Sequence, residues 1–388
     1  MTGPIRSAHL VIGGGLAGSM AALRLAEAGR AVTLLERERS PHHKVCGEFL
    51  SREAVHYLRQ AAIDPIALGA QPIRFLRLAA GRRVIETALP FTALSLSRAA
   101  LDEALLARAS QAGCNVLRGA FVESLEQQND HWIAHLRDGA SHSAPTVFLA
   151  TGKHDLRGIE RTSGRHSDMV GFKLQWCLVP QQTQAMRNYM DLYLFKGGYG
   201  GLSLVEGDAA TLCLVVRRAV LRKTGDWPKL LASVQQQTPH LAQRLASASP
   251  LWERPLAVSA IPYGYLAGRP NLWCIGDQAA CIPSFTGDGM SIALHSASLA
   301  AEMHLAGRSS NEYHRTLRTH LHRGMTLATT LSRLMVTSLG RNLAPAALSI
   351  YPSAMQSIAS LTRIPDKALL RSLAELTQDA LIKTKMSS

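Results

Sequence analysis

A glycine-rich turn near the N-terminus, between residues 7 and 36, most constrains how this chain can fold. A short apolar run at residues 10–12 leads into Gly13-Gly14-Gly15-Leu16-Ala17-Gly18, and an alanine-rich helical segment then leads to a second apolar run that ends at Glu36. Strand, glycine turn, helix, strand and acid, in this order, match the dinucleotide fingerprint G-x-G-x-x-G with glycines at positions 13, 15 and 18. The sequence therefore predicts a nucleotide site rather than a purely structural turn.

Each part of this turn has a physical role toward a dinucleotide. Gly13 permits the tight turn, Gly15 lets a pyrophosphate approach the backbone, and Gly18 lets the helix pack closely on the strand. The free amides and the dipole of the helix N-terminus favour phosphate groups. Glu36 follows Gly18 by about 18 residues, the spacing at which an acid binds ribose hydroxyls, and this disfavours NADP in the site.

Length and composition narrow the class of protein. A chain of 388 residues with 47% hydrophobic residues is expected to form more than one lobe around a proper core. Its net charge of +14 indicates either a solvated basic surface or attraction to acidic partners. With no nucleic-acid motif and no dense basic block, we expect no nucleic-acid partner. Six scattered cysteines without metal-ligand spacing favour reduced thiols in a cytoplasmic protein and no metal site.

The order of apolar runs predicts an α/β fold with an inserted sheet. Buried strands are expected at residues 146–150, which lead to Thr151-Gly152, and at 272–275, which lead to Gly276-Asp277; Ser97 is a candidate helix cap. Antiparallel strands are expected over residues 168–220, and helices from 306 onward. We predict a nucleotide-binding domain formed by residues 1–71, 97–165 and 265–305, a sheet domain formed by 72–96 and 166–264, and a helical C-terminal region, 306–388.

Membrane and targeting segments are not expected. The first strand begins near the N-terminus, which leaves no room for a signal peptide. No long apolar run free of helix breakers predicts a transmembrane span. The uncharged stretch 342–362 contains two prolines, and we interpret it as a buried or lipid-touching helical pair.

A second glycine-bearing stretch lies between residues 271 and 302. A buried strand ends at Gly276-Asp277, and a loop with Pro283, Gly287 and Gly289 precedes a helix of small residues. Glycines let backbone amides approach a ring, and the helix N-terminus favours partial negative charge. Asp277 can accept hydrogen bonds from sugar-alcohol hydroxyls.

These stretches together resemble the superfamily of FAD-dependent aromatic hydroxylases (flavoprotein monooxygenases) and geranylgeranyl reductases. The quoted glycines with Glu36, the Lys44-x-Cys46-Gly47-x-x-Leu50-Ser51 loop, Arg98-x-x-Leu101-Asp102, Ala150-Thr151-Gly152 and the segment from Gly276 to Met290 carry the resemblance. It implies a Rossmann-like FAD-binding domain of the glutathione-reductase type with a parallel sheet, an inserted antiparallel-sheet substrate domain and a helical C-terminal region.

The resemblance also implies roles for single residues. Glu36 would hold the adenosine ribose, Arg98 would lie along the flavin side of the FAD, and Asp277 would bind the ribityl and pyrophosphate region. The backbone amides from Gly287 to Met290 would face the isoalloxazine ring. The implied FAD-binding residues are Gly13, Gly15, Leu16, Ala17, Gly18, Glu36, Arg37, Cys46, Gly47, Arg98, Thr151, Gly152, Asp277, Pro283, Gly287, Gly289 and Met290.

Cys46 is the candidate catalytic residue. Its loop resembles that of the reductases, in which a cysteine sits beside the flavin, whereas the hydroxylases usually carry an arginine there. Lys44, two preceding histidines and the helix expected to follow favour a lowered pKa for the Cys46 thiol. Three roles stay open, namely active-site lining, a catalytic thiol and an inert thiol.

The chain departs from the family patterns at two places. Where hydroxylases carry G-A-D-G, a segment tied to the handling of FAD and NAD(P)H, this chain has Gly152-Lys153-His154-Asp155, which argues against direct use of NAD(P)H. The electron donor is expected to be NAD(P)H or a reductase partner. The aromatic Y-x-W-x-F-P strand of the reductases is replaced by residues 199–205, and the halogenase signature W-x-W-x-I-P is missing. We therefore expect a substrate pocket of different shape.

Three reactions remain. The preferred one is a monooxygenase that hydroxylates an apolar or phenolic, polyketide-like substrate, because oxygen chemistry is the commoner use of this fold. The alternative is a geranylgeranyl-reductase-like C=C reductase of a lipophilic substrate, and flavin-dependent halogenation is a minor one. A non-enzymatic flavin-binding scaffold is the remaining class.

The low aromatic content and the stretch 342–362 suggest a lipophilic substrate, which a carrier or a membrane would present. The basic cluster over residues 315–323 is interpreted as a solvated helix face, with docking as the alternative. His295 is expected to be a core histidine with hydrogen-bond partners, and Tyr199, Tyr263 and Tyr265 are candidate pocket residues. We expect a cytoplasmic protein, with peripheral association with the membrane as the alternative.

Overall fold

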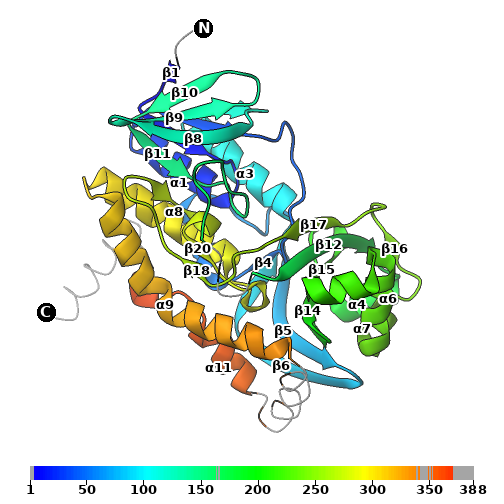
Figure 1. Ribbon diagram of the computed structural model, residues 1–388. Helices are drawn as coiled ribbons and strands as arrows, with labels where there is room; N and C mark the ends of the chain where they lie inside the picture. Colours follow the sequence, from blue (N-terminus) through cyan, green and yellow to red (C-terminus); the bar gives the residue numbers. More distant parts are fainter. Residues whose placement is uncertain are drawn as a thin grey trace, which may run out of the picture.

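The computed structural model describes residues 4–162, 164, 167–337, 340, 348, 351 and 353–369. Figure 1 shows a nucleotide-binding part near the N-terminus, a large sheet beside it and long C-terminal helices along one side. The architecture is the predicted mixed α/β fold, with a parallel-sheet FAD-binding domain, an antiparallel sheet region and C-terminal helices. The predicted domain boundaries stay a prediction.

A five-stranded sheet forms the centre of the nucleotide-binding part. Its pairings are all parallel. Its strands lie in the order β19 (Trp273–Cys274), β11 (Thr146–Leu149), β2 (His9–Ile12), β3 (Val32–Glu36) and β7 (Asn115–Arg118). Strands β2, β3 and β11 are buried almost throughout, as expected of parallel strands covered on both faces. Because parallel strands end at the same edge, the segments that follow them meet there.

Helix α1 (Leu16–Glu27) is the central helix on this sheet. It contacts both α3 (Arg98–Gln111) and α8 (Gly289–Leu305). A Cβ atom added at Gly18 would lie 1.8 Å from the carbonyl oxygen of Gly13, so only glycine allows this approach of helix and strand. The predicted helix cap at Ser97 is confirmed, because the Ser97 hydroxyl accepts a 3.1 Å hydrogen bond from the amide of Ala100.

A four-stranded sheet lies at the edge of the nucleotide-binding part, near the N-terminus in Figure 1. Its strand β9 (His131–Leu136) alternates between buried and more exposed residues. The other three strands are short or largely polar, which hides them from a hydrophobicity pattern. They are β1 (Ile5–Arg6), β8 (Val122–Gln128) and β10 (Ser141–Ala144).

The inserted region is built on a nine-stranded sheet. Its main path runs in the order β16 (Ser249–Pro250), β12 (Met169–Cys177), β15 (Ala210–Arg217), β14 (Gly198–Leu204), β13 (Asn188–Phe195), β5 (Gln71–Ala80), β6 (Arg83–Ser95) and β4 (Phe49–Leu50), and β17 (Leu256–Ser259) also pairs with β12. The expected strands over 168–220 pair antiparallel, but β13 pairs with β5 in parallel. A long connection separates these two strands in sequence, so no hairpin forces them to run in opposite directions.

Helices cover the outer part of this sheet and the C-terminal side. The group beside the sheet is α4 (Pro180–Met186), α5 (Arg218–Thr224), α6 (Trp227–Gln237) and α7 (Pro239–Arg244). Helix α9 (Ser310–Met335) runs along the other side, and α11 (Ser353–Leu361) packs on β6. The remaining elements are α2 (Arg52–Gln60), β18 (Tyr265–Leu266), β20 (Ala280–Cys281) and four 3-10 turns, η1 (Glu206–Asp208), η2 (Gly276–Gln278), η3 (Ser284–Thr286) and η4 (Asp366–Ala368).

Of the stretch 342–362, interpreted from the sequence as a helical pair, residues 342–347, 349, 350 and 352 lie outside the described residues, and the described remainder includes α11. Within the residues that the structure describes, no helix combines the length and the apolarity needed to cross a bilayer.

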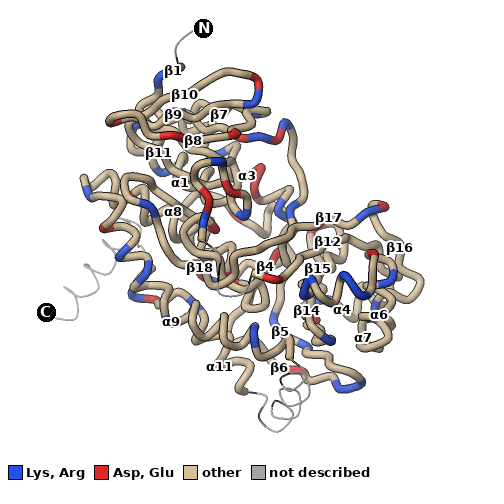
Figure 2. The backbone as a smooth tube through the Cα atoms, viewed as in Figure 1, with Lys and Arg blue, Asp and Glu red and all other residues tan. Residues whose placement is uncertain are grey.

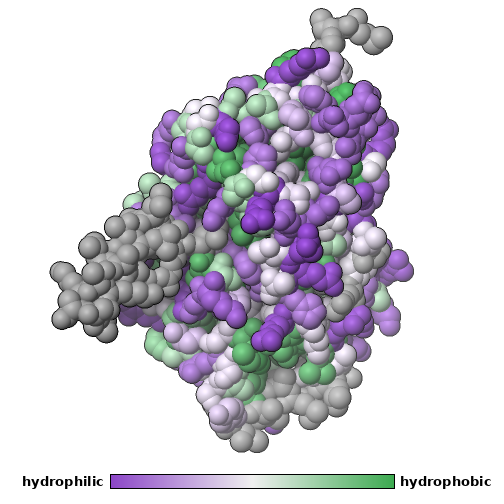
Figure 3. All heavy atoms as spheres, turned by 90° about the vertical axis from the view of Figure 1, so that its left-hand side faces the viewer, coloured by the Kyte–Doolittle hydropathy of each residue, from purple (hydrophilic) through white to green (hydrophobic). Residues whose placement is uncertain are grey.

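The basic residues of this chain are spread widely in the view of Figure 2. Figure 2 shows lysines and arginines spread over both parts of the molecule and along α9. Figure 3, which views the side along which α9 runs, shows a mostly hydrophilic surface with hydrophobic side chains gathered in its lower part. The exposed large hydrophobic residues of the C-terminal helical region are Leu334, Tyr351 and Leu361.

His295 is a buried core histidine, as expected. Its Nδ1 lies 2.7 Å from the hydroxyl oxygen of Tyr57, and its Nε2 lies 3.0 Å from Nδ1 of His320 on α9. Burial, together with the nearby His320, lowers the pKa of His295 to about 3. The ring is therefore neutral in the folded protein at neutral pH and joins α2, α8 and α9.

Replacing His295 with glutamine should reduce the loss of stability in acid. In the unfolded chain the histidine takes up a proton below its ordinary pKa of about 6.5, whereas in the folded protein it does so only near pH 3. As the pH falls below about 6.5, the free energy of unfolding should therefore decrease more steeply for the wild type than for His295→Gln. The difference in slope should be up to about 1.4 kcal/mol per pH unit. Urea unfolding between pH 7 and 4.5 measures this slope. The exposed His131→Gln is the control, and equal slopes for wild type and His295→Gln would contradict the prediction.

Candidate functional site

A cavity of about 520 Å³ lies where the parallel sheet meets the nine-stranded sheet. One part is lined by the glycine turns of the nucleotide-binding region. The other part is lined mainly by apolar side chains of the large sheet and its neighbours, including Phe49, Met190, Val215, Val258 and Ile261. The two parts form one continuous space, so a cofactor in the first part would meet a ligand in the second.

Most of the predicted FAD-binding residues come together around this cavity, although their segments are far apart in sequence. Those that line it are Gly13, Gly15, Leu16, Ala17, Glu36, Arg37, Cys46, Gly47, Arg98, Thr151, Gly152, Asp277, Gly287, Gly289 and Met290. Gly18 and Pro283 do not line it. Gly18 lies beneath the turn, where it sets the helix–strand distance, and buried Pro283 comes directly before η3. The role of each residue in binding FAD stays a prediction.

Two cations lie over the glycine turn. A Cβ atom on Gly15 would be 3.4 Å from both Nη2 of Arg98 and Nζ of Lys44, so the missing side chain leaves room beside two positive charges. Arg98 donates from Nε to Oδ1 of Asp102 at 2.7 Å, and Lys44 donates to Oδ2 at 2.8 Å. Two cations and one carboxylate at the N-terminus of α1 suit a pyrophosphate.

The protonation states agree with this arrangement. Burial opposes the charge on Asp102, but Arg98 and Lys44 outweigh it and lower the pKa of the carboxyl group. Burial likewise opposes the charge on Arg98, but Asp102 and Cys46 outweigh this effect and raise the pKa of Arg98. Lys44 and Asp102 belong to the quoted motifs but were missed as site residues; the four-residue spacing of Arg98 and Asp102 on a helix could have indicated the pair.

Glu36 holds the glycine turn as well as facing the cavity. Its Oε2 accepts a 2.6 Å hydrogen bond from the amide of Gly14, and its Oε1 accepts a 2.8 Å bond from the amide of Glu38. A Cβ atom on Gly14 would lie 2.9 Å from Oε2, so a side chain at this position would displace the carboxylate of Glu36. A carboxylate has about four acceptor positions, and two remain for the hydroxyls of a ribose.

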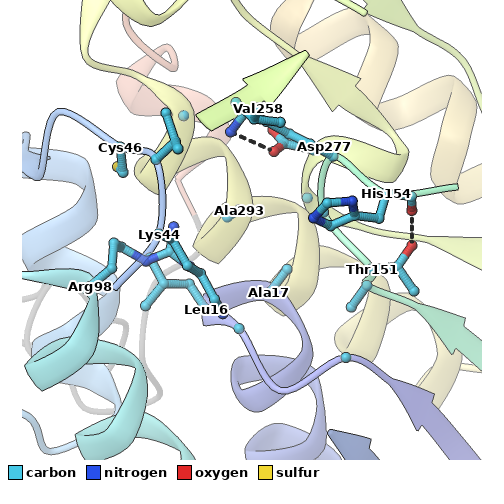
Figure 4. A pocket seen from close by; sticks show the side chains of 18 of the residues that line it. Leu16, Ala17, Lys44, Cys46, Arg98, Thr151, His154, Val258, Asp277 and Ala293 are labelled. Atoms are coloured by element: carbon cyan, nitrogen blue, oxygen red, sulfur yellow. Dashed lines mark hydrogen bonds and ion pairs between the residues drawn. The ribbon is translucent and has the colours of Figure 1, made fainter. Parts of the chain in front are cut away.

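The opposite side of the cavity carries Asp277 and the segment after β11. Nζ of Lys153 lies 3.3 Å from Oδ2 of Asp277, and this carboxylate raises the pKa of Lys153. Thr151 donates from its hydroxyl to the carbonyl oxygen of His154 at 2.6 Å, which shapes the turn. Figure 4 shows Cys46, Lys44 and Arg98 on one side of the cavity and Thr151, His154 and Asp277 on the other. Lys153 and His154, noted in the sequence only as a departure from G-A-D-G, thus line the site.

The loop before α8 is held by the C-terminal segment. Gly287 has a φ of 73°, and a Cβ atom there would lie 2.6 Å from Phe49, so this position requires glycine. Asp288 is buried, and its Oδ1 accepts a 2.5 Å bond from Arg363, which also donates to the carbonyl oxygen of Thr286 at 3.2 Å. Burial raises the pKa of Asp288 to about 6 even though Arg363 acts against the shift. Arg363 was missed because nothing in the local sequence marks it.

Cys46 lies at the junction of the two parts of the cavity, near Arg98 of the nucleotide-binding part and near Cys213 of β15. It is a free thiol of intermediate exposure, and its Sγ accepts a 3.4 Å contact from the amide of Glu48. It lines the cavity together with its neighbours Val45 and Gly47. This placement is compatible with lining or with proton donation, and its catalytic role stays a prediction.

Glu48 connects the Cys46 loop to the large sheet and to α3. The side chain is fully buried on a residue with a φ of 59°, a left-handed backbone conformation that is unusual for glutamate. Its Oε1 accepts from the amide of Arg98 at 2.8 Å and from Nζ of Lys173 in β12, and its Oε2 accepts from the hydroxyl of Thr211 in β15 at 2.7 Å. Lys173 is also fully buried. The pair was missed because its members lie 125 residues apart.

Replacing Glu48 with glutamine should strongly destabilise the protein. The buried ammonium of Lys173 would lose its carboxylate, which typically costs about 3–5 kcal/mol. The double variant Glu48→Gln/Lys173→Met should regain much of this loss, because both charges are then gone. Denaturant unfolding of the two single variants and the double variant measures the coupling.

The control is Arg187→Gln, which breaks an exposed 2.8 Å ion pair with Asp208 and should cost at most about 1 kcal/mol. A Glu48→Gln protein as stable as the wild type would show that the buried pair does not hold the loop.

The chain was compared with protein families, curated proteins and solved structures. The model of an FAD binding domain family matches residues 6–148. Menaquinone reductase of Mycolicibacterium smegmatis is 25% identical over 357 residues, which cover 85% of this chain and 85% of that protein. Digeranylgeranylglycerophospholipid reductase 2 of Methanopyrus kandleri is 25% identical over 315 residues, covering 76% of each chain.

Among solved structures, the flavin-dependent brominase Bmp2 superposes with a TM-score of 0.74 and 15% identity, covering 99% of this chain and 100% of that chain. At this identity the likeness concerns the fold alone. The family match covers the glycine turn and Glu36, and the relatives span most of the chain. This protein therefore carries an FAD binding domain and is an FAD-dependent oxidoreductase, similar over most of its length to menaquinone reductase and to digeranylgeranylglycerophospholipid reductase.

Proposed function

We propose that this enzyme is a flavin-dependent reductase that acts on a C=C bond of a lipophilic substrate. The observation that carries the proposal is the position of Cys46 at the junction between the FAD-binding part and the apolar part of one cavity. The names of the relatives that span 85% and 76% of the chain, both reductases, support it. These two observations reverse the order of the two hypotheses from the sequence, so the monooxygenase becomes the second candidate.

The chain's own residues have three tasks in such a reaction. Reduced FAD would supply the hydride, and NAD(P)H or a reductase partner would supply its electrons. The apolar side chains around Val258 and Ile261 would hold the substrate and exclude water. The thiol of Cys46 is the candidate donor of the proton that completes the reduction, and Arg98 with Lys44 would hold the cofactor in place.

A monooxygenase is the second candidate because the same wall would also keep water from an oxygen-activating flavin. Ile261 and Tyr263 on that wall are 1% and 2% exposed, so the far end of the cavity is well shielded. Halogenation has weaker support. The similar brominase is only 15% identical, and this chain lacks the W-x-W-x-I-P signature.

We further propose that the substrate is taken from a membrane surface, with a carrier protein as the alternative. Arg315, Arg318 and Arg323 are exposed along α9, and Leu334 and Leu361 are exposed near the C-terminal end of the described chain. Cations beside exposed hydrophobic side chains suit an anionic lipid surface. Figures 2 and 3 show both features on the side where α9 lies.

Anaerobic photoreduction of the FAD-loaded protein tests the reaction. Reduced enzyme should be reoxidised, without oxygen, by polyprenyl lipids whose C=C bond becomes saturated, and flavin absorbance near 450 nm together with product mass would report this. Reoxidation only by oxygen, with an oxygenated product formed from an apolar phenol, would instead establish the monooxygenase. Saturated lipids of the same chain length are the control for nonspecific effects.

Replacing Cys46 with alanine separates lining from proton donation. If the thiol donates the proton, Cys46→Ala should lower turnover about 10²-fold or more while the FAD dissociation constant stays close to that of the wild type. Flavin fluorescence titration measures the latter. Cys177→Ala, which removes an exposed thiol outside the cavity, is the matched control. Unchanged turnover in Cys46→Ala would remove the thiol from the mechanism.

A further inference from the structure

Three hydroxyl groups meet at the apolar end of the cavity. Tyr263 donates from its hydroxyl to Oγ of Ser284 at 2.9 Å, and the hydroxyl oxygen of Tyr199 lies 3.3 Å from the same Oγ. Ser284 begins η3, three residues before Gly287 in the loop that leads into α8. Tyr199 belongs to β14 of the large sheet. The hydroxyl cluster, Ser284 with Tyr263 and Tyr199, therefore joins the two parts of the molecule beside the predicted flavin loop.

The surroundings of the hydroxyl cluster are apolar. Tyr199 and Tyr263 belong to a hydrophobic cluster that includes Met169, Val215 and Ile261. The two tyrosines are 5% and 2% exposed, whereas Ser284 is exposed and lines the cavity. A single polar position on an apolar wall is what fixes the orientation of a lipophilic ligand.

The structure gives the direction of one hydrogen bond of the cluster, which runs from Tyr263 to Ser284. Burial raises the pKa of Tyr263 well above its ordinary value and also raises that of Tyr199, so both phenols stay protonated. A buried phenol without an acceptor is costly, and the oxygen of Ser284 lies within hydrogen-bond distance of both phenols. Tyr199 also has Ser332 and Tyr263 as hydrogen-bond partners, so the cluster does not need the hydrogen of Ser284, and that hydrogen is available to the cavity.

The remaining hydrogen makes Ser284 a donor toward the cavity. A phenol that donates to a hydroxyl, as Tyr263 does to Ser284, polarises that hydroxyl and strengthens the bond that the hydroxyl donates in turn. The complementary group on a ligand is an acceptor oxygen that carries no hydrogen of its own. A carbonyl oxygen on an apolar ring or chain, as in a quinone or an enone, has this character.

We propose that Ser284, supported by Tyr263 and Tyr199, is a binding subsite for the carbonyl-type oxygen of a lipophilic substrate. This inference rests on the proposed function, since it names the chemical class of the substrate that the apolar part of the cavity takes. A bond from Ser284 would hold the oxygen next to the segment Gly287–Met290 and leave the hydrocarbon part against Val215, Val258 and Ile261. The subsite selects oxygen-bearing ligands, because a ligand without the oxygen leaves the donor unpaired.

Ligand binding to the oxidised, FAD-loaded protein tests the subsite without turnover. The probes are 2-methyl-1,4-naphthoquinone and 2-methylnaphthalene, which share the ring but differ in the two oxygens. Calorimetric titration gives both dissociation constants, and the ratio of the two constants is compared between wild type and variant so that the solvation of each probe cancels. Ser284→Ala should weaken the quinone roughly 10-fold, the usual scale of one hydrogen bond, and leave the hydrocarbon unchanged.

Two further variants sharpen the test. Tyr263→Phe should change the ratio in the same direction but less, because Ser284 keeps its own hydroxyl. Ser203→Ala is the matched control. It removes a buried hydroxyl from β14, the strand that also carries Tyr199. This hydroxyl lies outside the cavity, 3.1 Å from the hydroxyl of Ser95, so its loss should leave the ratio unchanged. FAD content and circular dichroism confirm that each variant is folded.

The outcomes separate this inference from the proposed function. If Ser284→Ala keeps the wild-type ratio, the subsite is wrong while the reductase proposal stands. If the wild type does not bind the quinone, the subsite is wrong, and the reoxidation experiment with polyprenyl lipids still decides the reductase proposal. If the ratio changes as expected but the reduced enzyme transfers no hydride to any C=C bond, the subsite stands and the proposed reaction is wrong.

Discussion

The close approach of α1 to β2 at Gly13 and Gly18 is the constraint on which the rest of this structure depends. A Cβ atom at position 18 would meet the carbonyl oxygen of Gly13 at 1.8 Å, so the N-terminus of α1 can reach the sheet edge only with glycine there. Glu36 then fastens the turn from the neighbouring strand through the amide of Gly14. With the turn held in this way, the positive end of α1 and the cations Arg98 and Lys44 face the same space, where a pyrophosphate would lie.

Buried charge pairs set how the parts of the molecule sit around this turn. Glu48 and Lys173 join the Cys46 loop to the large sheet, and Asp288 and Arg363 join the loop before α8 to the C-terminal segment. Such pairs add little net stability compared with apolar packing, but a pair with one partner removed is strongly unfavourable. They therefore favour one arrangement of the parts over others. The Cys46 loop and the loop before α8, which both line the cavity, are thus each fixed by an ion pair with a distant part of the chain.

The division of the cavity into a charged part and an apolar part limits the chemistry. The charged part suits an anionic dinucleotide, and the apolar part suits a ligand with few polar groups. Between them lie Cys46 and the start of α8, where the flavin ring is predicted. Reduction and oxygenation both need such a shielded junction, so the reaction is decided by which acceptor reaches the flavin. The hydroxyl cluster at Ser284 is the feature of the apolar wall that we propose distinguishes one acceptor from another.

The sequence by itself determined the features that depend on local backbone geometry and periodicity. The glycine turn, Glu36, the buried strands, the capped helix at Ser97 and the loop around Gly287 were all predicted from short segments, and the structure places these segments as expected. The polar strands β8 and β10 were not predicted, because they carry no apolar pattern. Only the tertiary structure decided which side chains meet across long separations, such as Glu48 with Lys173, 125 residues apart, and Asp288 with Arg363, 75 residues apart. These contacts depend on how separate elements pack, and no spacing within one element encodes them.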